Sequence, residues 1–401
     1  NRPVVSVCKR YPFCKNPSLK IHNKNIRSKT KPFFGRHLCI FGYQQPPYMA
    51  ISENIKIKRA ARSKIAQTDF ADIPLGRYFT DHMFTCNYEE GKWKAPRIEP
   101  LAPVPTHPAA MALHYGQAIF EGTKATLHTN GVPLLFRPKK NAERLNQSAH
   151  RMSMPHFPEK LFVESLKQLV KLDRNWIPPQ EGSGLYLRPF MYANEPFIGM
   201  RPAAHYKFTV IASPAVPLFN KRIKLRAEKK YIRAARGGTG QAKAAGNYAA
   251  ALRPAELAKA DGYDQVLWLD AHRHKYIQEV GTMNIFFKIE GKFITPHLDG
   301  CVLKGITRTS VIELLEHMGH EVTERAITID EIAQAAQNGA LEEAFGTGTA
   351  VGIAHIEAIG WGKKNIHVGN QSPVASAVRD LLNRIKTGRA KDHFGWTVAV
   401  Q

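Results

Sequence analysis

Several features that would place this 401-residue sequence in a familiar class are missing from it. It has no run of about 18 consecutive apolar residues, which excludes an ordinary membrane-spanning helix. Its five cysteines form no CxxC pair and no zinc-ligand spacing, so the sequence predicts neither a metal site nor a disulfide framework. This cysteine usage is typical of a reducing compartment.

Acidic residues are scarce, and their distribution along the chain decides whether the net positive charge indicates a nucleic-acid or membrane partner. The net charge is +24, but residues 1–66 alone hold 15 lysines and arginines against one acid, Glu53, a balance of +14. The rest of the chain carries the other +10 without basic runs or any RRM, zinc-finger or helix-turn-helix signature. We therefore expect no nucleic-acid and no membrane partner. The alternative, a basic binding protein driven by residues 1–66, would associate with such partners in a salt-sensitive way.

Residues 1–48 contain no acid and no steady apolar period. They fit an organellar transit peptide, which is basic and acid-poor, or sequence upstream of the true start, because Met49 opens an ordinary-looking N-terminus. The second interpretation is slightly favoured, and with it a cytoplasmic location. A transit peptide would place the protein in the mitochondrial or plastid matrix. In both cases residues 1–66 are interpreted as a disordered basic extension.

The length exceeds what one hydrophobic core usually supports, about 250–300 residues, and predicts two domains. The Pro-containing segment 213–222 is the predicted linker between a small N-terminal domain, residues 67–212, and a large domain, residues 223–401. Strand-like and helix-like patterns occur in both, so the predicted class is α+β with two lobes. Strands are predicted at 79–88, 133–138, 184–193, 206–215, 264–270 and 276–296 (with a hairpin turn at Glu290-Gly291), and helices at 138–152, 158–172, after Gly305 and at 374–388.

The stretch GGTGQAKAAGNYAA, residues 237–250, places Lys243 among glycine, alanine and threonine. A buried lysine loses its charge readily, and its neutral amine can form a Schiff base with a carbonyl. The alternative is a surface lysine in a glycine-rich loop. Tyr248 follows at the start of a predicted helix, and Glu279 interrupts an apolar strand, where an unpaired carboxylate would be costly. An amine, a hydroxyl donor and a carboxylate are what a pyridoxal 5′-phosphate ring needs.

Candidate phosphate ligands occur in three other segments. Gly305-Ile306-Thr307 opens a predicted helix, whose free amides and dipole favour an anion. The sequence FGTGTA, residues 345–350, follows a predicted strand and offers Thr347, Thr349 and further amides. Arg144 could add a bidentate contact. Each is generic by itself: a helix start, a turn and a surface arginine.

Together these segments resemble the branched-chain amino-acid aminotransferases, pyridoxal 5′-phosphate enzymes of fold type IV, over about residues 65–398. The resemblance implies a smaller α+β N-terminal domain, a larger C-terminal domain with a barrel-like β core, and a homodimer. The segments that carry it are FTDHMF, LHYGQAIFEGTKA, NAERL, GLYLRPF, GGTGQAKAAGNYAA, DQVLWLD, QEVGTMNIFF, GITR and FGTGTA.

The resemblance assigns roles around the cofactor. It makes Lys243 the Schiff-base lysine and the proton shuttle, pairs Glu279 with the pyridinium nitrogen, and directs Tyr248 to the ring hydroxylate. Thr282 would lie beside the ring nitrogen, and Arg233 at the cofactor's edge. The phosphate would be held by Arg144, the amides of Ile306 and Thr307, and Thr349.

The resemblance also assigns substrate contacts. Tyr186 and Arg188 match the pair near the α-carboxylate, which the backbone of Thr349 and Ala350 also reaches. The apolar pocket would be lined by Tyr115, from the partner subunit or the dimer-facing lobe, and by Phe120. Arg188 with Tyr115 is the candidate site for the side-chain carboxylate of glutamate. Seen alone, the aromatic residues would be interpreted as core.

The implied reaction is reversible ping-pong transfer of the amino group of L-leucine, L-isoleucine or L-valine to 2-oxoglutarate, which yields the branched 2-oxo acid and L-glutamate. D-Amino-acid aminotransferases and aminodeoxychorismate lyases share the lysine, the glutamate and the phosphate segments, and they remain the alternative. Two positions depart from the family pattern: Leu75, where phenylalanine is frequent, and Lys304, where proline is usual and whose presence frees a backbone N–H.

Overall fold

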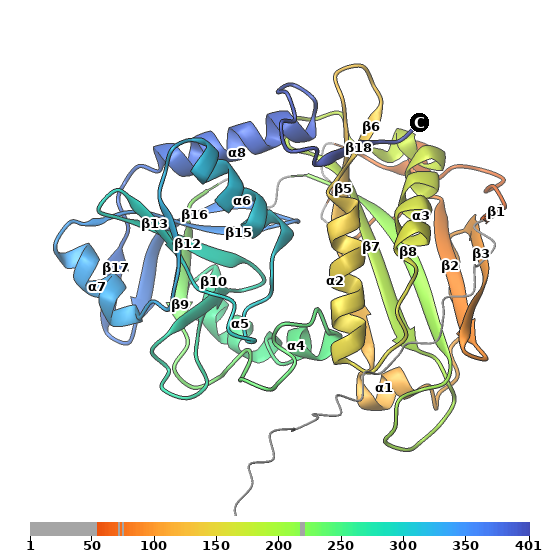
Figure 1. Cartoon of the computed structure of the whole chain (residues 1–401), viewed down its shortest axis with the longest axis horizontal. Helices are drawn as coiled ribbons and strands as arrows, with labels where there is room; N and C mark the ends of the chain where they lie inside the picture. Colours follow the sequence, from red (N-terminus) through yellow and green to blue (C-terminus); the bar gives the residue numbers. More distant parts are fainter. Residues whose placement is uncertain (1–53, 71–72, 74–75, 217–220) are drawn as a thin grey trace, which may run out of the picture. The chain divides into compact units, whose positions relative to one another are not determined.

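Two β-sheets of nine strands each, with helices packed on them, make up the described part of the chain (Figure 1). The computed structural model describes residues 54–70, 73, 76–216 and 221–401, all within one unit, Met49–Gln401. Leu75 and parts of the predicted extension and linker lie outside the described residues. The predicted domain boundaries remain a prediction.

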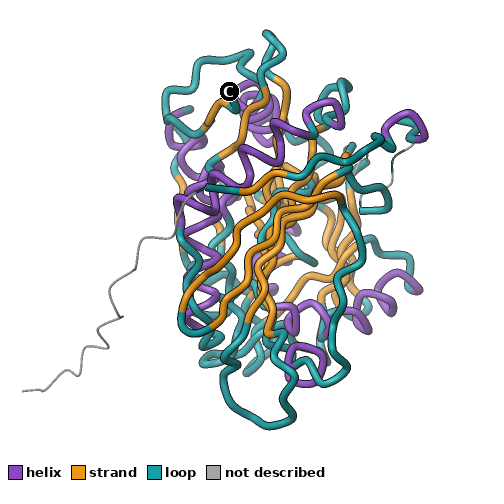
Figure 2. The backbone as a smooth tube through the Cα atoms, turned by 90° about the vertical axis from the view of Figure 1, so that its right-hand side faces the viewer, coloured by secondary structure: helices purple, strands orange, loops and turns teal. Residues whose placement is uncertain are grey.

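The first sheet is built mainly from the N-terminal half of the chain and has the order β1-β3-β2-β8-β7-β5-β6-β18, with β4 on β7. Its longest pair, β7 and β8, is antiparallel from Gly184↔Ala215 to Ala193↔Tyr206. Figure 2 shows long strands lying side by side with a pronounced twist. The strands are β1 Lys56–Ile57, β2 His82–Glu89, β3 Lys92–Pro100, β4 Ala118–Phe120, β5 Thr123–Leu127, β6 Pro133–Phe136, β7 Gly184–Ala193, β8 Tyr206–Ala215 and β18 Thr397–Ala399.

The second sheet follows the order β11-β10-β9-β16-β15-β12-β13-β14, with β17 on β16. It is mixed, because β9 pairs in parallel with both β10 and β16. Its strands are β9 Ile223–Ala227, β10 Gln265–Leu269, β11 Ile277–Val280, β12 Asn284–Ile289, β13 Lys292–Thr295, β14 Val322–Glu324, β15 Leu341–Gly348, β16 Gly352–Trp361 and β17 Lys364–His367.

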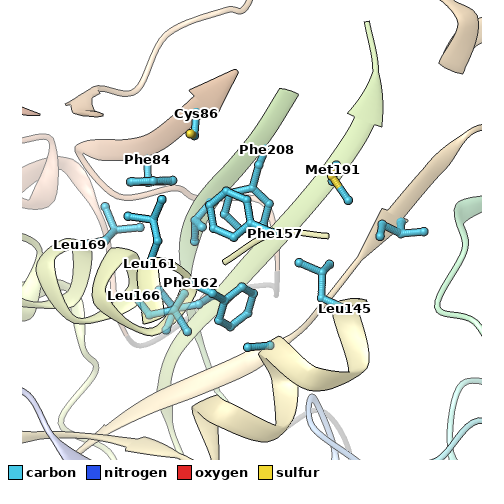
Figure 3. Close-up of a cluster of buried hydrophobic side chains, with 14 of the residues drawn as sticks. Phe84, Cys86, Leu145, Phe157, Leu161, Phe162, Leu166, Leu169, Met191 and Phe208 are labelled. Carbon is cyan, nitrogen blue, oxygen red and sulfur yellow. The ribbon is translucent and has the colours of Figure 1, made fainter. Parts of the chain in front are cut away.

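Helices form at the four segments where the sequence predicts them: 138–152, 158–172, after Gly305 and 374–388. Helix α3 buries Leu161, Phe162, Leu166 and Leu169, and these side chains point toward Phe84 and Phe208 of the first sheet (Figure 3). The helices are α1 Met111–Tyr115, α2 Pro138–Arg151, α3 Glu159–Leu172, α4 Ala245–Ala249, α5 Leu252–Ala260, α6 Ile306–His317, α7 Ile329–Gln337 and α8 Pro373–Lys386, with 3-10 turns at Ile65–Gln67 and Arg174–Trp176.

Local turn chemistry explains the predicted hairpin. Glu290 and Gly291 both have positive φ, 49° and 77°, between paired strands β12 and β13, as a two-residue turn of the mirror-image type requires. The FGTGTA segment differs from its prediction as a turn after a strand. Its first four residues continue β15, and the turn comes only at residues 349–351.

The end of the predicted disordered extension also differs from expectation. Residues 56–57 form β1 beside β3, and Ile55 and Ile65 pack against the core of the first sheet. The amide of Lys64 donates to Asp81 at 2.8 Å. Burial of these apolar side chains offsets the cost of ordering the segment.

Candidate active site

A cavity of about 660 Å³ brings together residues from both sheets. The first sheet contributes side chains from β4, β7 and β8, and the second contributes the turn before β12, the end of β15 and the start of α6. Eleven of the sequence-predicted residues line it: Phe120, Arg144, Tyr186, Arg188, Lys243, Tyr248, Thr282, Ile306, Thr307, Thr349 and Ala350.

Lys243 lies in the segment before α4, and its backbone is fixed on both sides. Its amide donates to Ser148 Oγ of α2 at 2.9 Å, and its carbonyl accepts from the amide of Phe120 at 3.0 Å. The neighbours Ala242 and Ala244 are buried in the core of the first sheet. The small residues around Lys243 thus let the chain pack closely against α2 and β4, and they leave the long side chain as the group that enters the cavity.

The amine of Lys243 is held among groups that disfavour its charge. Burial lowers the pKa of Lys243 to about 8, and the positive charge of Arg144 acts in the same direction. Nζ donates to Tyr248 Oη at 2.9 Å and lies 4.9 Å from the centre of the Phe120 ring. Burial raises the pKa of Tyr248 to about 12, so its hydroxyl keeps its proton. The alternative of a surface lysine is wrong.

Glu279 on β11 is 4% exposed and has its partners in place. Its carboxylate lies 3.0 Å from Arg233 Nε and accepts from the amide of Leu303 at 2.7 Å and from Asn284 Nδ2 at 3.3 Å. Burial raises the pKa of Glu279, and the charge of Arg233 opposes this shift. Glu279 and Arg233 line a small chamber that shares Tyr248 and Thr282 with the large cavity.

The start of α6 supplies unused backbone donors. Its N-cap, Gly305, offers no side chain to cap the helix, so the first amides face the cavity without a local acceptor. A Cβ at Gly305 would lie 2.0 Å from Asn284 Oδ1, so only glycine permits this approach. Thr347 Oγ1, on another wall of the cavity, is buried without a hydrogen-bond partner. Together these groups form a site for an anion.

Arg144 differs from the surface arginine expected of its segment taken alone. It is 7% exposed, and its Nε and Nη2 donate to the two carboxylate oxygens of Glu121 at 2.7 and 2.8 Å. Nη1 donates to the carbonyl of Lys304 at 3.1 Å. The side chain is therefore fixed at the cavity wall, beside the start of α6.

Glu121 and Asn284 are site residues to which the sequence reasoning gave no role. Glu121 is fully buried and also accepts from Asn141 Nδ2 at 2.8 Å. Asn284 links Glu279 to the carbonyl of Leu303. The signal was available for Glu121: it is an acid within the otherwise apolar segment AIFEGT, and a buried carboxylate demands a cation.

A second group of residues, all on the first sheet, also lines the cavity. Arg188 Nη2 donates to Tyr186 Oη at 3.1 Å, and its guanidinium lies 4.6 Å from the centre of the Phe120 ring. The Phe120 and Tyr248 rings lie 4.7 Å apart, which joins this group to Lys243. Tyr115 is not brought to this cavity; it is 42% exposed at the end of α1.

The comparisons with known proteins agree on one family. The model of the family "Amino-transferase class IV" matches residues 118–359. The chain is 46% identical over 354 residues to Branched-chain-amino-acid aminotransferase 2 of Bacillus subtilis, covering 87% of this chain and 97% of that protein. It is 40% identical to the branched-chain-amino-acid aminotransferase of Mycolicibacterium smegmatis, covering 84% and 94%.

Solved structures show the same fold. The crystal structure of the Escherichia coli branched-chain amino acid aminotransferase superposes with a TM-score of 0.67 at 25% identity, over 80% of this chain and 99% of that one. The branched-chain amino acid aminotransferase of Thermobaculum terrenum, solved in its PLP-form, gives 0.65 at 23% identity, over 79% and 98%. The predicted α+β fold is thereby confirmed.

Proposed function

The chain belongs to the class IV aminotransferases and, within them, to the branched-chain-amino-acid aminotransferases, and we propose that it transfers the amino group of L-leucine, L-isoleucine or L-valine reversibly to 2-oxoglutarate. One observation carries this proposal most directly: the Lys243 amine donates to Tyr248 Oη at 2.9 Å in the cavity that Arg188 and Phe120 also line. The two relatives described above bear the branched-chain name, which favours this reading over D-amino-acid aminotransferase or aminodeoxychorismate lyase activity.

The donor set of the cavity fits pyridoxal 5′-phosphate. A desolvated amine, a buried carboxylate and an uncapped helix start correspond to the aldehyde, the ring nitrogen and the phosphate. When bound, the cofactor supplies an aldehyde that condenses with amines and a ring that accepts the electron pair left at the substrate Cα. Lys243 would hold the aldehyde carbon, and Glu279 would face the ring nitrogen with Thr282 beside it.

The phosphate would be held by Arg144 and by the start of α6, with the amides of Ile306 and Thr307 and the hydroxyl of Thr349. Tyr248 would donate to the ring oxygen, and its high pKa keeps that proton available. Arg233 does not need to touch the cofactor. Its proposed role is to keep Glu279 charged through the 3.0 Å ion pair.

Lys243 would also carry the proton during transamination. In the cofactor-free site burial lowers the pKa of Lys243 to about 8, close to the operating range that general base catalysis favours, so a free Nζ would be suited to take a proton from the substrate. Nζ would take the proton from the substrate Cα and hold it beside Tyr248 Oη. It would then deliver the proton to the carbon of the cofactor that carried the aldehyde. Arg144 helps because its charge lowers the pKa of Lys243.

Substrates of two kinds must fit the same cavity. Phe120 offers an apolar face to leucine, isoleucine and valine. Tyr186, Arg188 and the backbone at Thr349 and Ala350 would bind the α-carboxylate. Arg188 would also reach the side-chain carboxylate of glutamate, because its guanidinium lies over the Phe120 ring, within the apolar region.

The assembly and the location complete the proposal. Leu113 and Tyr115 are exposed apolar residues on α1, 66% and 42%, which supports a homodimer in which Tyr115 reaches the partner's cavity. Among the described helices, none has the length and apolar character needed to cross a membrane. A cytoplasmic location is proposed because Cys86 and Cys301 are free and buried; the mitochondrial or plastid matrix is the alternative.

One assay tests the function. The purified protein is expected to form glutamate from L-leucine and 2-oxoglutarate but not from D-alanine, and Lys243→Ala should abolish this turnover while circular dichroism shows an unchanged fold. Substantial turnover by Lys243→Ala would refute the assignment. Activity with D-alanine alone would instead favour the alternative enzymes of this fold.

A further inference from the structure

A second cavity, of about 490 Å³, lies beside the candidate active site and shares Thr349 and Val351 with it. This volume falls within the range of small-molecule sites, about 300–1,000 Å³. Most of the charged residues in its lining are cationic. The lining includes five lysines and arginines but only two acids: Lys124, Lys221, Arg222, Arg379 and Lys386, against Glu181 and Asp380.

Two of these lysines lie at the junction of β5 with the end of α8 (Figure 1). Lys124 Nζ donates to the carbonyl of Ala350 at 3.1 Å, and Lys386 Nζ lies 4.6 Å from the centre of the Phe136 ring. Among the ion pairs of the described residues, none involves either lysine. Burial lowers the pKa of Lys124 to about 8, and burial together with the charge of Lys124 lowers that of Lys386 to about 7.

Three buried polar atoms on the same lining have no hydrogen-bond partner: Ser183 Oγ, Arg222 Nε and His355 Nδ1. Buried polar groups are normally paired, so these three atoms leave hydrogen-bonding capacity unused beside the cavity. Burial and the nearby Arg379 and Arg222 lower the pKa of His355 to about 4. Its ring is therefore neutral at pH 7 and adds no charge to the lining.

The two acids do not neutralise this lining. Glu181 forms its ion pair with Arg389, at 2.6 Å, and Asp380 is exposed on α8. Of the cations, Lys221 is paired with Asp264 at 3.0 Å. Arg222 donates through Nη2 to the carbonyls of Ile356 and Gly369, at 2.8 and 2.6 Å, and through Nη1 to the carbonyl of Asn370. These neutral partners leave its positive charge in place.

We propose that this cavity is a second ligand site, which binds a small dianion, a phosphate or a dicarboxylate, between Lys124, Lys386 and Arg222. A doubly charged oxyanion would accept hydrogen bonds from the two lysine amines and would offset the repulsion between them. The site is distinct from the cofactor phosphate site at α6, because neither lysine lines that cavity.

Occupation of the site has a consequence for the neighbouring cavity, and this consequence alone rests on the proposed function. Lys124 holds the carbonyl of Ala350, in the turn proposed to bind the substrate α-carboxylate. A dianion that attracts Lys124 changes this contact. The expected result is a shift in the KM for L-leucine at unchanged kcat.

The test is isothermal titration of the holoenzyme, whose cofactor site is filled, with inorganic phosphate and separately with succinate. We expect at least one of them to bind. Lys386→Met keeps the apolar stem over Phe136 but removes the charge, and it should weaken binding about tenfold, the equivalent of one charge-assisted hydrogen bond. Lys386→Arg should retain binding. The matched control is Lys259→Met, at an exposed lysine of α5.

Proton uptake on anion binding distinguishes binding at Lys386 from nonspecific attraction of the anion to a positively charged protein. Titrations near pH 7.5 in two buffers of different ionisation enthalpy should show proton uptake by the wild type, because the anion raises the low pKa of Lys386, and less uptake by Lys386→Met. Binding that is unchanged in Lys386→Met, or no heat from either probe, would overturn the proposal. These titrations contain no amino-acid substrate, so their outcome is separate from that of the transaminase assay.

Discussion

Replacing Glu121 by glutamine tests the buried ion pair that fixes Arg144 at the cavity wall. Glu121 is fully buried, and both of its oxygens accept from Arg144, at 2.7 and 2.8 Å. Glutamine has nearly the same shape but only one acceptor oxygen and no charge. The substitution therefore leaves the guanidinium of Arg144 buried beside a neutral amide.

The size of the effect follows from the burial of both partners. Removing one member of a buried ion pair costs about 3–5 kcal/mol of unfolding free energy, because the remaining charge is uncompensated. Since the glutamine oxygen can keep one hydrogen bond, we expect the lower end, about 3 kcal/mol. Glu143→Gln is the matched control. Glu143 pairs with Lys140, whose side chain is 52% exposed, and such a surface pair contributes at most about 1 kcal/mol.

The assay is urea unfolding of the cofactor-free protein at one fixed protein concentration, for Glu121→Gln, Arg144→Gln and the double variant. If the pair acts as described, the double variant loses less stability than the two single losses together, by about 2 kcal/mol or more. Additive losses, within about 0.5 kcal/mol, would show that the two residues act independently and would refute the reasoning.

Three further results are expected. Glu279→Gln should lower kcat about 100-fold, as loss of one preorganised charge in an active site does; an unchanged kcat would remove its role opposite the ring nitrogen. In the cofactor-free protein, trinitrobenzenesulfonate should label Lys243 with an apparent pKa near 8 rather than the ordinary 10.5, so that labelling rises with pH through 8; labelling only near pH 10 would contradict the burial argument. Gly122→Ala would place a Cβ 2.1 Å from Tyr186 Oη and should raise the KM for L-leucine by displacing that ring, whereas Gly246→Ala, with open space around its Cβ, should not; equal KM values would refute the contact.

The sequence alone predicted several elements whose signal is local. The predictions of helices α3 and α8 and of the Glu290-Gly291 turn need only neighbouring residues, and the structure confirms them. Periodicity did not reveal that β9 pairs in parallel with β10 and β16, because such pairing joins segments far apart in the chain. It also did not reveal that β18, at the C-terminus, returns to pair with β6 of the first sheet.

The same division holds for the candidate site. Lys243, Tyr248 and Glu279 could be proposed as site residues from the sequence because each is a chemically unusual residue in its own segment. The partners that tune them were not all found, since Glu121 and Asn284 act through contacts that only the folded chain creates. Tyr115 remains a prediction, because its proposed place is in the cavity of a second subunit. The effects of Leu75 and Lys304 also remain predictions.

The central claim is that one side chain carries the cofactor. Borohydride reduction of the purified holoenzyme, followed by proteolysis and mass spectrometry, locates the lysine to which the pyridoxyl group becomes attached. We predict a single modified peptide with the label on Lys243. A label on another lysine, or no label on a protein that still forms glutamate from L-leucine, would contradict the account.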